Sequence, residues 1–132
     1  MFGKKRQPPI KSLIAFGTTI TGDLAFGEGL RIDGAVLGNL TAATGQPSLL
    51  VVSETAQIRG EIAADHIIIN GHVCGPVRAR ELLELQPKAR VEGDVHYKAL
   101  EMHQGATITG LLGPLPLAVE EKPALKLAAN NG

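Results

Sequence analysis

The chain has few aromatic residues and almost no cysteine. It contains no tryptophan, one tyrosine and three phenylalanines, so its interior must be filled mainly by aliphatic side chains. A single cysteine cannot form an internal disulfide, which favours a reducing, intracellular setting. No apolar run approaches the roughly 18 residues that a membrane-spanning helix needs. The formal net charge of zero at pH 7 gives no reason to expect nucleic-acid binding.

What the sequence does contain is a short repeat centred on glycine. Each copy reads β-branched residue, any residue, Gly, any residue, aliphatic residue. Successive copies begin between 15 and 22 residues apart, at Ile20, Val36, Ile58, Val73, Val91 and Ile108. A period this short, built from strand-forming residues, is typical of a β-solenoid, in which every repeat is one coil stacked on the previous coil. A β-sandwich would not carry six superposable copies at this spacing.

The repeat also predicts which side chains point into the solenoid. Side chains alternate between the two sides of a strand, so the β-branched residue and the aliphatic residue after the glycine both face inward. An aliphatic residue or Met stands six positions before each copy, and we expect it to form another inward column: Ile14, Leu30, Val52, Ile67, Leu85 and Met102. The residue after the glycine faces outward and is often polar, at Asp23, Asn39, Glu61 and Asp94. Residues 41–48, in the longest interval, should form an outward loop.

The repeats predict a single all-β domain over residues 12–113, flanked by tails at 1–11 and 114–132. We expect both tails to be disordered, the first being basic and the second containing prolines. Neither contains an amphipathic helix that would cap a solenoid, so both ends should expose strand edges over apolar side chains. We therefore expect the ends to stack on those of other copies, through Ile14, Phe16, Ile20, Leu24 and Phe26 at one end and Leu100, Met102, Ile108 and Leu112 at the other.

The N-terminal tail carries a second signal. Met1 and Phe2 precede three consecutive cations, Lys4, Lys5 and Arg6. The two apolar side chains can insert at a lipid surface while the cations lie near anionic head groups. The alternative is a basic segment that serves only solubility. We expect peripheral membrane binding that is weak for one copy and strong for a polymer that presents many tails.

Two stretches add detail to the repeat, because residues 32–38 and 69–75 each place two glycines four positions apart. Together with the six copies and the Met-Phe-Gly-Lys-Lys start, they make the chain resemble the bactofilins, a family of bacterial cytoskeletal proteins, over about residues 12–113. The resemblance implies a right-handed parallel β-helix that polymerises without nucleotide into nonpolar filaments. It also implies attachment to the cytoplasmic face of the cell membrane through the N-terminal tail, and scaffolding of cell-shape or cell-wall enzymes.

An enzyme on a left-handed β-helix, such as a hexapeptide-repeat acyltransferase or a zinc carbonic anhydrase, is the main alternative. Such enzymes keep a regular six-residue repeat, which the unequal intervals here do not. A zinc site of this kind needs converging histidines, whereas His66, His72, His96 and His103 fall in four different columns of the repeat. Cys74 is expected to be an inert outward or corner residue.

The sequence therefore predicts no catalytic residue, no metal and no cofactor. Because it also lacks a phosphate-binding loop, we expect no nucleotide among its partners. A monomeric binding module that uses the flat faces of the solenoid is the remaining possibility.

Overall fold

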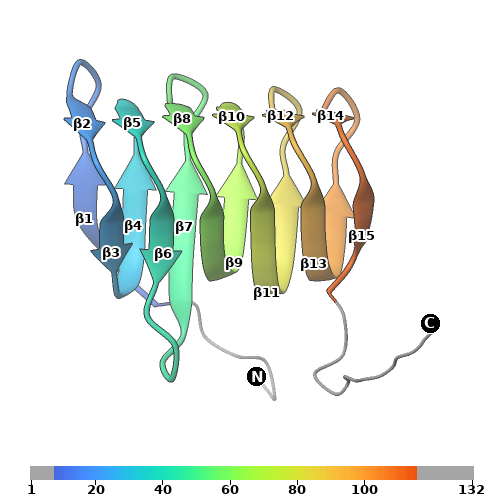
Figure 1. Ribbon diagram of the computed structural model, residues 1–132, viewed down its shortest axis with the longest axis horizontal. Helices are drawn as coiled ribbons and strands as arrows, with labels where there is room; N and C mark the ends of the chain where they lie inside the picture. The colour runs from blue at the N-terminus through green and yellow to red at the C-terminus, as the bar shows by residue number, and fades with distance from the viewer. Residues whose placement is uncertain (1–7, 116–132) are drawn as a thin grey trace.

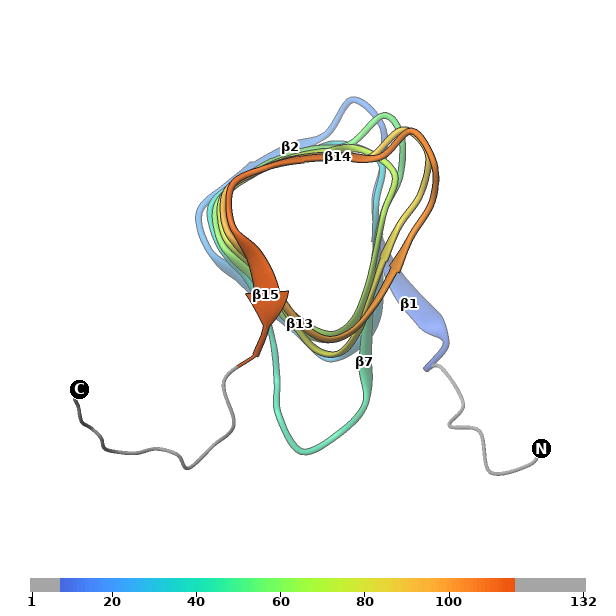
Figure 2. The ribbon, with the colours of Figure 1, turned by 90° about the vertical axis from the view of Figure 1, so that its right-hand side faces the viewer.

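The computed structural model describes residues 8–115, which form fifteen β-strands and no helix. The strands wind into a rod of six stacked coils with three flat faces (Figures 1 and 2). Figure 2 looks onto the C-terminal end, and the chain runs anticlockwise as it approaches the viewer, so the coil is right-handed. The predicted all-β parallel solenoid of about six coils is confirmed.

The upper face of the rod is a six-stranded parallel sheet to which each coil contributes one short strand. The β-branched residue lies at the centre of each strand, and these residues pair in register from coil to coil. The strands are β2 (Thr19–Thr21), β5 (Ala35–Leu37), β8 (Gln57–Arg59), β10 (His72–Cys74), β12 (Arg90–Glu92) and β14 (Thr107–Thr109).

The front and back faces share a nine-stranded sheet. Strands β3 (Leu24–Phe26), β6 (Leu40–Ala42) and β15 (Leu112–Pro114) lie on the front face, and β1 (Ile10–Ile14), β4 (Glu28–Ile32) and β7 (Ser48–Val52) lie on the back face. Three longer strands bend around the lower edge and belong to both faces, namely β9 (Ile62–Ile69), β11 (Val77–Leu85) and β13 (Val95–Met102). The first strand thus begins two residues before the expected start of the domain at residue 12, and the last strand ends one residue after its expected end at 113.

The core is a set of aliphatic ladders that run along the rod. The column of β-branched residues and the column of aliphatic residues two positions after the glycine both point inward as predicted. In the four inner coils their side chains are at most 1% exposed. Aliphatic side chains stacked at the spacing of neighbouring strands, about 4.8 Å, exclude water from the whole interior. The buried members of the two columns are Val36, Ile58, Val73 and Val91, and Leu40, Ile62, Val77 and Val95.

The third predicted column is wrong at two of its six positions. Ile32 and Ile69 stand in register with Val52, whereas Leu30 and Ile67 belong to a neighbouring inward column. The reason lies in the turn from the back face to the upper face. This turn is two residues long in the second coil (β4 to β5) and in the fourth coil (β9 to β10), and four residues long in the other coils. In these two coils, counting six positions back from the β-branched residue therefore reaches a residue that lies two positions too early in the chain.

The short turns explain the paired glycines of the sequence. Gly34 lies directly beside the longer turn of the first coil, and a Cβ atom added to it would lie 2.4 Å from the backbone oxygen of Thr18. A Cβ atom added to Gly71 would likewise lie 2.2 Å from the backbone oxygen of Ser53. Only glycine lets a short turn pack against a longer one at this distance.

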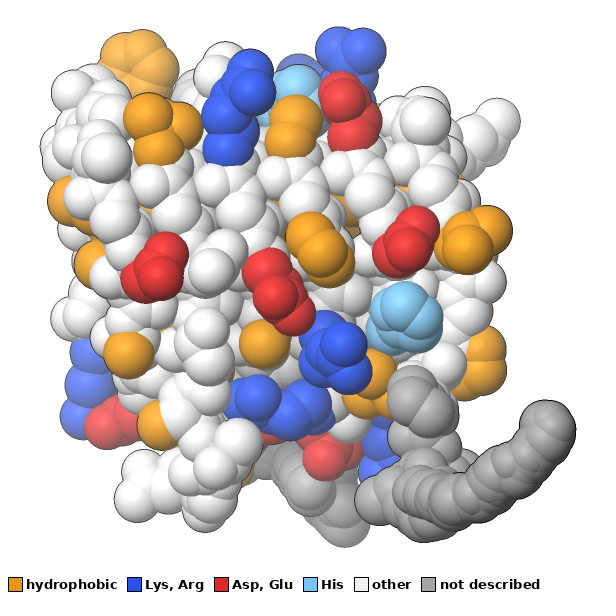
Figure 3. Space-filling model, in the orientation of Figure 1, with side chains coloured by type: hydrophobic (Ala, Val, Ile, Leu, Met, Phe, Trp, Pro, Cys, Tyr) orange, Lys and Arg blue, Asp and Glu red, His pale blue; other side chains and the backbone are white. Residues whose placement is uncertain are grey.

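The polar column after the glycine has a structural role that the sequence did not indicate. The side chain of Asp23 accepts a hydrogen bond from the backbone N–H of Asn39 at 2.9 Å, and Asn39 accepts one from Glu61 at 2.8 Å. The residue that follows Glu61 in the column is Pro76, which has no N–H to donate. Figure 3 shows the acidic members of the column as a row across the front of the rod. Asp94 accepts a hydrogen bond from the backbone N–H of Leu111 at 3.1 Å. The column therefore ties neighbouring coils together at three of the five junctions and is more than a solvated face.

The expected outward loop is present between β6 and β7, and it extends below the rod (Figure 1). The Asp65 carboxylate holds its base by accepting hydrogen bonds from the backbone N–H of Ser48 at 3.1 Å and from the Arg80 Nε at 2.8 Å. Arg80 also donates to the backbone oxygen of Ala42 at 3.1 Å. The base of the loop is therefore fixed on both sides.

Candidate polymerisation interface

Large apolar side chains are exposed almost entirely in the first and last coils of the rod. Within residues 8–115, seven large hydrophobic side chains are exposed, and six of them belong to the first or the last coil. Those six are Ile10, Leu13, Phe16, Met102, Leu111 and Leu112, and the exception is Leu37 in the second coil. An apolar surface concentrated in the two end coils indicates contacts made there.

The N-terminal end is formed by the inward side chains of the first coil. They pack on the core from one side only and are partly buried: Ile14, Ile20, Leu24 and Phe26. In the described part of the chain, β1, β2 and β3 each pair with a single strand, in the second coil. Their other backbone edge is open for a further strand.

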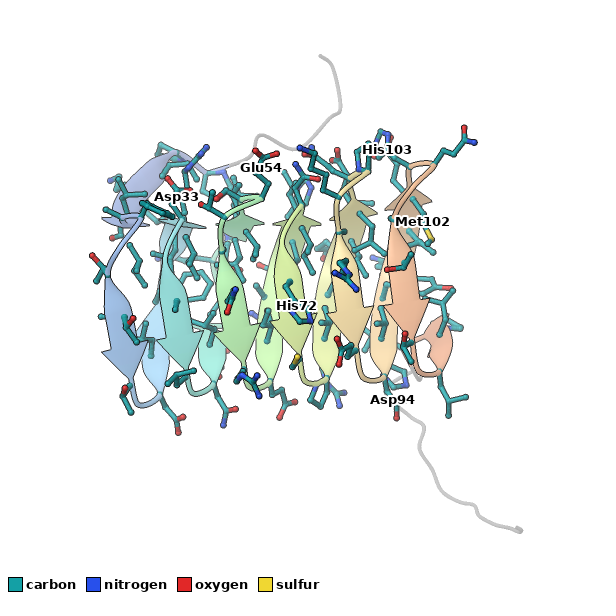
Figure 4. The ribbon with its side chains drawn as sticks, turned by 90° about the horizontal axis from the view of Figure 1, so that it is seen from above. Asp33, Glu54, His72, Asp94, Met102 and His103 are labelled. Atoms are coloured by element: carbon teal, nitrogen blue, oxygen red, sulfur yellow. The ribbon has the colours of Figure 1, made fainter. Side chains whose placement is uncertain are left out.

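The C-terminal end has the same construction. Leu100 and Ile108 are partly buried against the fifth coil, while Met102 and Leu112 are 45% and 46% exposed. Figure 4 shows Met102 at this end of the rod. The structure therefore brings all four predicted residues of this end to one coil.

An inward column of the front face changes size along the rod. Its central members are the buried Ala42, Ala64 and Ala79, whereas Phe26 stands beside Ala42 in the first coil and Tyr97 beside Ala79 in the fifth. The inner coils thus leave room for a methyl group only, and the rings are accommodated near the ends. Tyr97 is an aromatic residue near the C-terminal end that the sequence interpretation did not include.

Phe16 lies elsewhere than the other residues predicted for the N-terminal end. It occupies the turn before β2, where its side chain is 76% exposed and lines a groove together with Arg31, Asp33 and Glu54. The groove lies over the short turn of the second coil. Phe16 therefore contributes to the side of the rod as well as to its end.

Sequence reasoning missed three exposed apolar residues of the end coils, Ile10, Leu13 and Leu111. Ile10 falls in the segment assigned to the tail, and Leu13 points outward in register with Arg31. The exposure of Leu111 was predictable from the sequence, because Leu111 fills the outward position after the glycine, which is polar in four other copies. Its side chain is 74% exposed.

The histidines do not converge on one another. His66 is half-buried, and its burial holds the pKa of the imidazole below its usual value. His72 lies instead beside Cys74 and Glu92, a grouping treated below. The residues of the predicted membrane tail, Met1 to Arg6, lie outside the described part of the chain. Residues 8–115 contain no helix that is long and apolar enough to cross a membrane.

The fold and its ends define a class, a short parallel β-solenoid with apolar side chains exposed at both ends of the rod. The sequence profile of the bactofilins, described as polymer-forming and cytoskeletal, matches residues 12–112. This match covers most of the chain, and the protein belongs to the bactofilin family.

Two known proteins are similar to it. Bactofilin BacP of Myxococcus xanthus (strain DK1622) is 30% identical over 91 residues, which are 69% of this chain and 36% of BacP. The chain therefore spans about a third of the length of that relative. A cryo-EM reconstruction of Thermus thermophilus bactofilin double helical filaments superposes with a TM-score of 0.72 and 28% identity, covering 79% of this chain and 99% of that one.

These comparisons confirm the predicted family and the predicted structural class. The bactofilins are a polymer-forming cytoskeletal family and not a family of enzymes. The alternative of an acyltransferase or a carbonic anhydrase is therefore set aside.

Proposed function

We propose that this chain is a scaffold that assembles end to end into nonpolar filaments without nucleotide. The observation that carries the proposal is that six of the seven exposed large hydrophobic side chains of residues 8–115 belong to the first and last coils. The similar Thermus thermophilus protein was reconstructed as a filament, which supports assembly in a chain of the same fold.

Two terms favour stacking in this geometry, apolar burial and strand pairing. Each end carries at least four partly exposed aliphatic or aromatic side chains. Completing their burial contributes about 1 kcal/mol each, or roughly 8 kcal/mol for two ends. That is within the range of about 4–15 kcal/mol that association costs. Backbone hydrogen bonds between the open strand edges add about 1 kcal/mol each, so burial and strand pairing together drive the contact.

Nothing in this contact needs a nucleotide, because burial and strand pairing drive it. Electron microscopy of the purified full-length chain, in buffer treated with apyrase, tests the assembly directly. We expect filaments of unchanged length with and without added ATP or GTP. Monodisperse particles at every protein concentration would show a monomeric binding module instead.

The second part of the proposal is attachment to the cytoplasmic face of the cell membrane by the N-terminal tail. In a filament the tails form a multivalent array, so weak single contacts add up. The scaffold would then hold cell-shape or cell-wall enzymes at the membrane, as the resemblance to bactofilins implies.

Deleting residues 2–6 is expected to abolish binding to anionic vesicles. The deletion removes Phe2 and the three cations Lys4, Lys5 and Arg6, which contribute about 3 kcal/mol per tail through electrostatics alone. Co-sedimentation with phosphatidylglycerol-containing vesicles measures the bound fraction. The matched control deletes residues 128–132 from the other tail and should bind as the full chain does. Equal binding by the two deletions would contradict the proposed role of the N-terminal tail.

A further inference from the structure

Three side chains of different chemistry converge on the upper face of the rod. His72 and Cys74 stand two positions apart on β10, so both point outward, and Glu92 on β12 is paired directly with Cys74. Figure 4 looks down on this face and shows His72 near its middle. One ligand atom from each of the three residues lies within 4.8 Å of the other two.

The distances fit a small tetrahedral metal ion. The Sγ of Cys74 lies 3.5 Å from the Nε2 of His72. A zinc ion bonded to sulfur at about 2.3 Å and to nitrogen at about 2.05 Å, with tetrahedral angles, sets these two atoms about 3.6 Å apart. The same geometry sets nitrogen and carboxylate oxygen about 3.3 Å apart, and the hydrogen-bonded pair of His72 and Glu92 is at 2.7 Å. The nitrogen and the oxygen must move apart by about 0.6 Å to admit the ion, which rotation of the two side chains allows.

We propose that His72, Cys74 and Glu92 form a binding site for a divalent transition-metal ion of the zinc type. A thiolate, an imidazole and a carboxylate are the ligands that zinc prefers, whereas magnesium and calcium prefer oxygen ligands only. The side chains of His72 and Glu92 are 36% and 55% exposed. The fourth coordination position therefore faces solvent and takes a water molecule.

The surroundings of the site set its charge balance. Arg59 neighbours Cys74 and Arg90 neighbours His72 in the strand register. The thiolate and the carboxylate neutralise the charge of the dication, while the two guanidinium groups oppose its entry. Coordination replaces the S–H bond of Cys74 with a metal–sulfur bond, and the proton leaves to solvent.

Equilibrium dialysis of the full-length chain against zinc chloride, with the thiol kept reduced, tests the site. We expect one zinc ion per chain and a cobalt(II) derivative with the absorption of a thiolate-bound tetrahedral ion. Cys74→Ser and His72→Gln should each weaken zinc binding by about tenfold or more. The matched control is His96→Gln, on the front face, which should bind zinc as the unsubstituted chain does.

A second measurement uses the unsubstituted chain and does not depend on the folding of any variant. Cys74 is the only cysteine, so the rate of alkylation by iodoacetamide reports on this residue alone. We expect zinc to slow alkylation at least tenfold and magnesium to leave it unchanged. An alkylation rate that zinc does not alter, or zinc affinity that survives Cys74→Ser, would overturn the proposal.

Discussion

An aspartate in place of Ile108 is expected to convert the filaments into dimers. Ile108 is an inward residue of the last coil and is partly buried against the core. In the separate chain the new carboxylate still reaches water, but in a stack it would be enclosed by the apolar end of the next copy. An unpaired charge in such a contact costs about 3 kcal/mol or more, which weakens it roughly a hundredfold.

The companion substitution Ile20→Asp lies in the same column at the opposite end, and the pair of variants reports the polarity of assembly. If like ends meet, as in the proposed nonpolar filament, each single variant keeps one intact contact and forms dimers. The double variant is then monomeric. If unlike ends meet, either single variant is already monomeric. Sedimentation equilibrium distinguishes these outcomes.

The control for both variants is a charge on the side of the rod. Thr19 and Thr107 adjoin Ile20 and Ile108 on β2 and β14, and their side chains are exposed outward. Thr19→Asp and Thr107→Asp should form filaments as the unsubstituted chain does. Filaments that persist in the Ile20→Asp/Ile108→Asp double variant would remove end-to-end stacking from consideration.

Much of the fold was predictable because one local rule repeats. The glycine-centred copies specify the upper strand, the turn after it and the inward residue of the front face, and the register confirms all six. The back face was less predictable because its distance from the repeat depends on the preceding turn. Leu30 and Ile67 were misassigned for this reason, since a two-residue and a four-residue turn cannot be told apart by counting from the glycine.

The candidate sites also differ in how far the sequence predicts them. The apolar ends follow from the first and last copies, because position in the stack alone decides which coil lacks a neighbour. Phe16 lies in a turn, where periodicity says nothing about direction. The grouping of His72 and Cys74 with Glu92 depends on which residues two neighbouring strands place side by side. That the four histidines fall in different columns of the repeat says nothing about a grouping of one histidine with a cysteine and a glutamate.

The largest expected effect on stability is that of Gly60→Ala. Gly60 has φ of +153°, and a Cβ atom there would lie 2.1 Å from the backbone oxygen of Gly38 in the preceding coil. Relief of the contact requires the two coils to separate, which breaks backbone hydrogen bonds such as that from Gly38 N–H to the Arg59 oxygen at 2.9 Å. Backbone strain and the broken ladder together predict a loss of about 4 kcal/mol or more. Urea unfolding followed by circular dichroism measures this loss.

Gly22→Ala is the matched control, because Gly22 holds the same position in the first coil. Its φ is +127°, but an added Cβ atom would meet nothing within 4 Å. This variant therefore carries the conformational strain without the contact, and it should lose only about 1–2 kcal/mol. Both substitutions are best compared in the Ile20→Asp/Ile108→Asp background, so that assembly does not contribute to stability. If the two variants unfold at the same urea concentration, the close approach of successive coils at the glycine column does not limit stability.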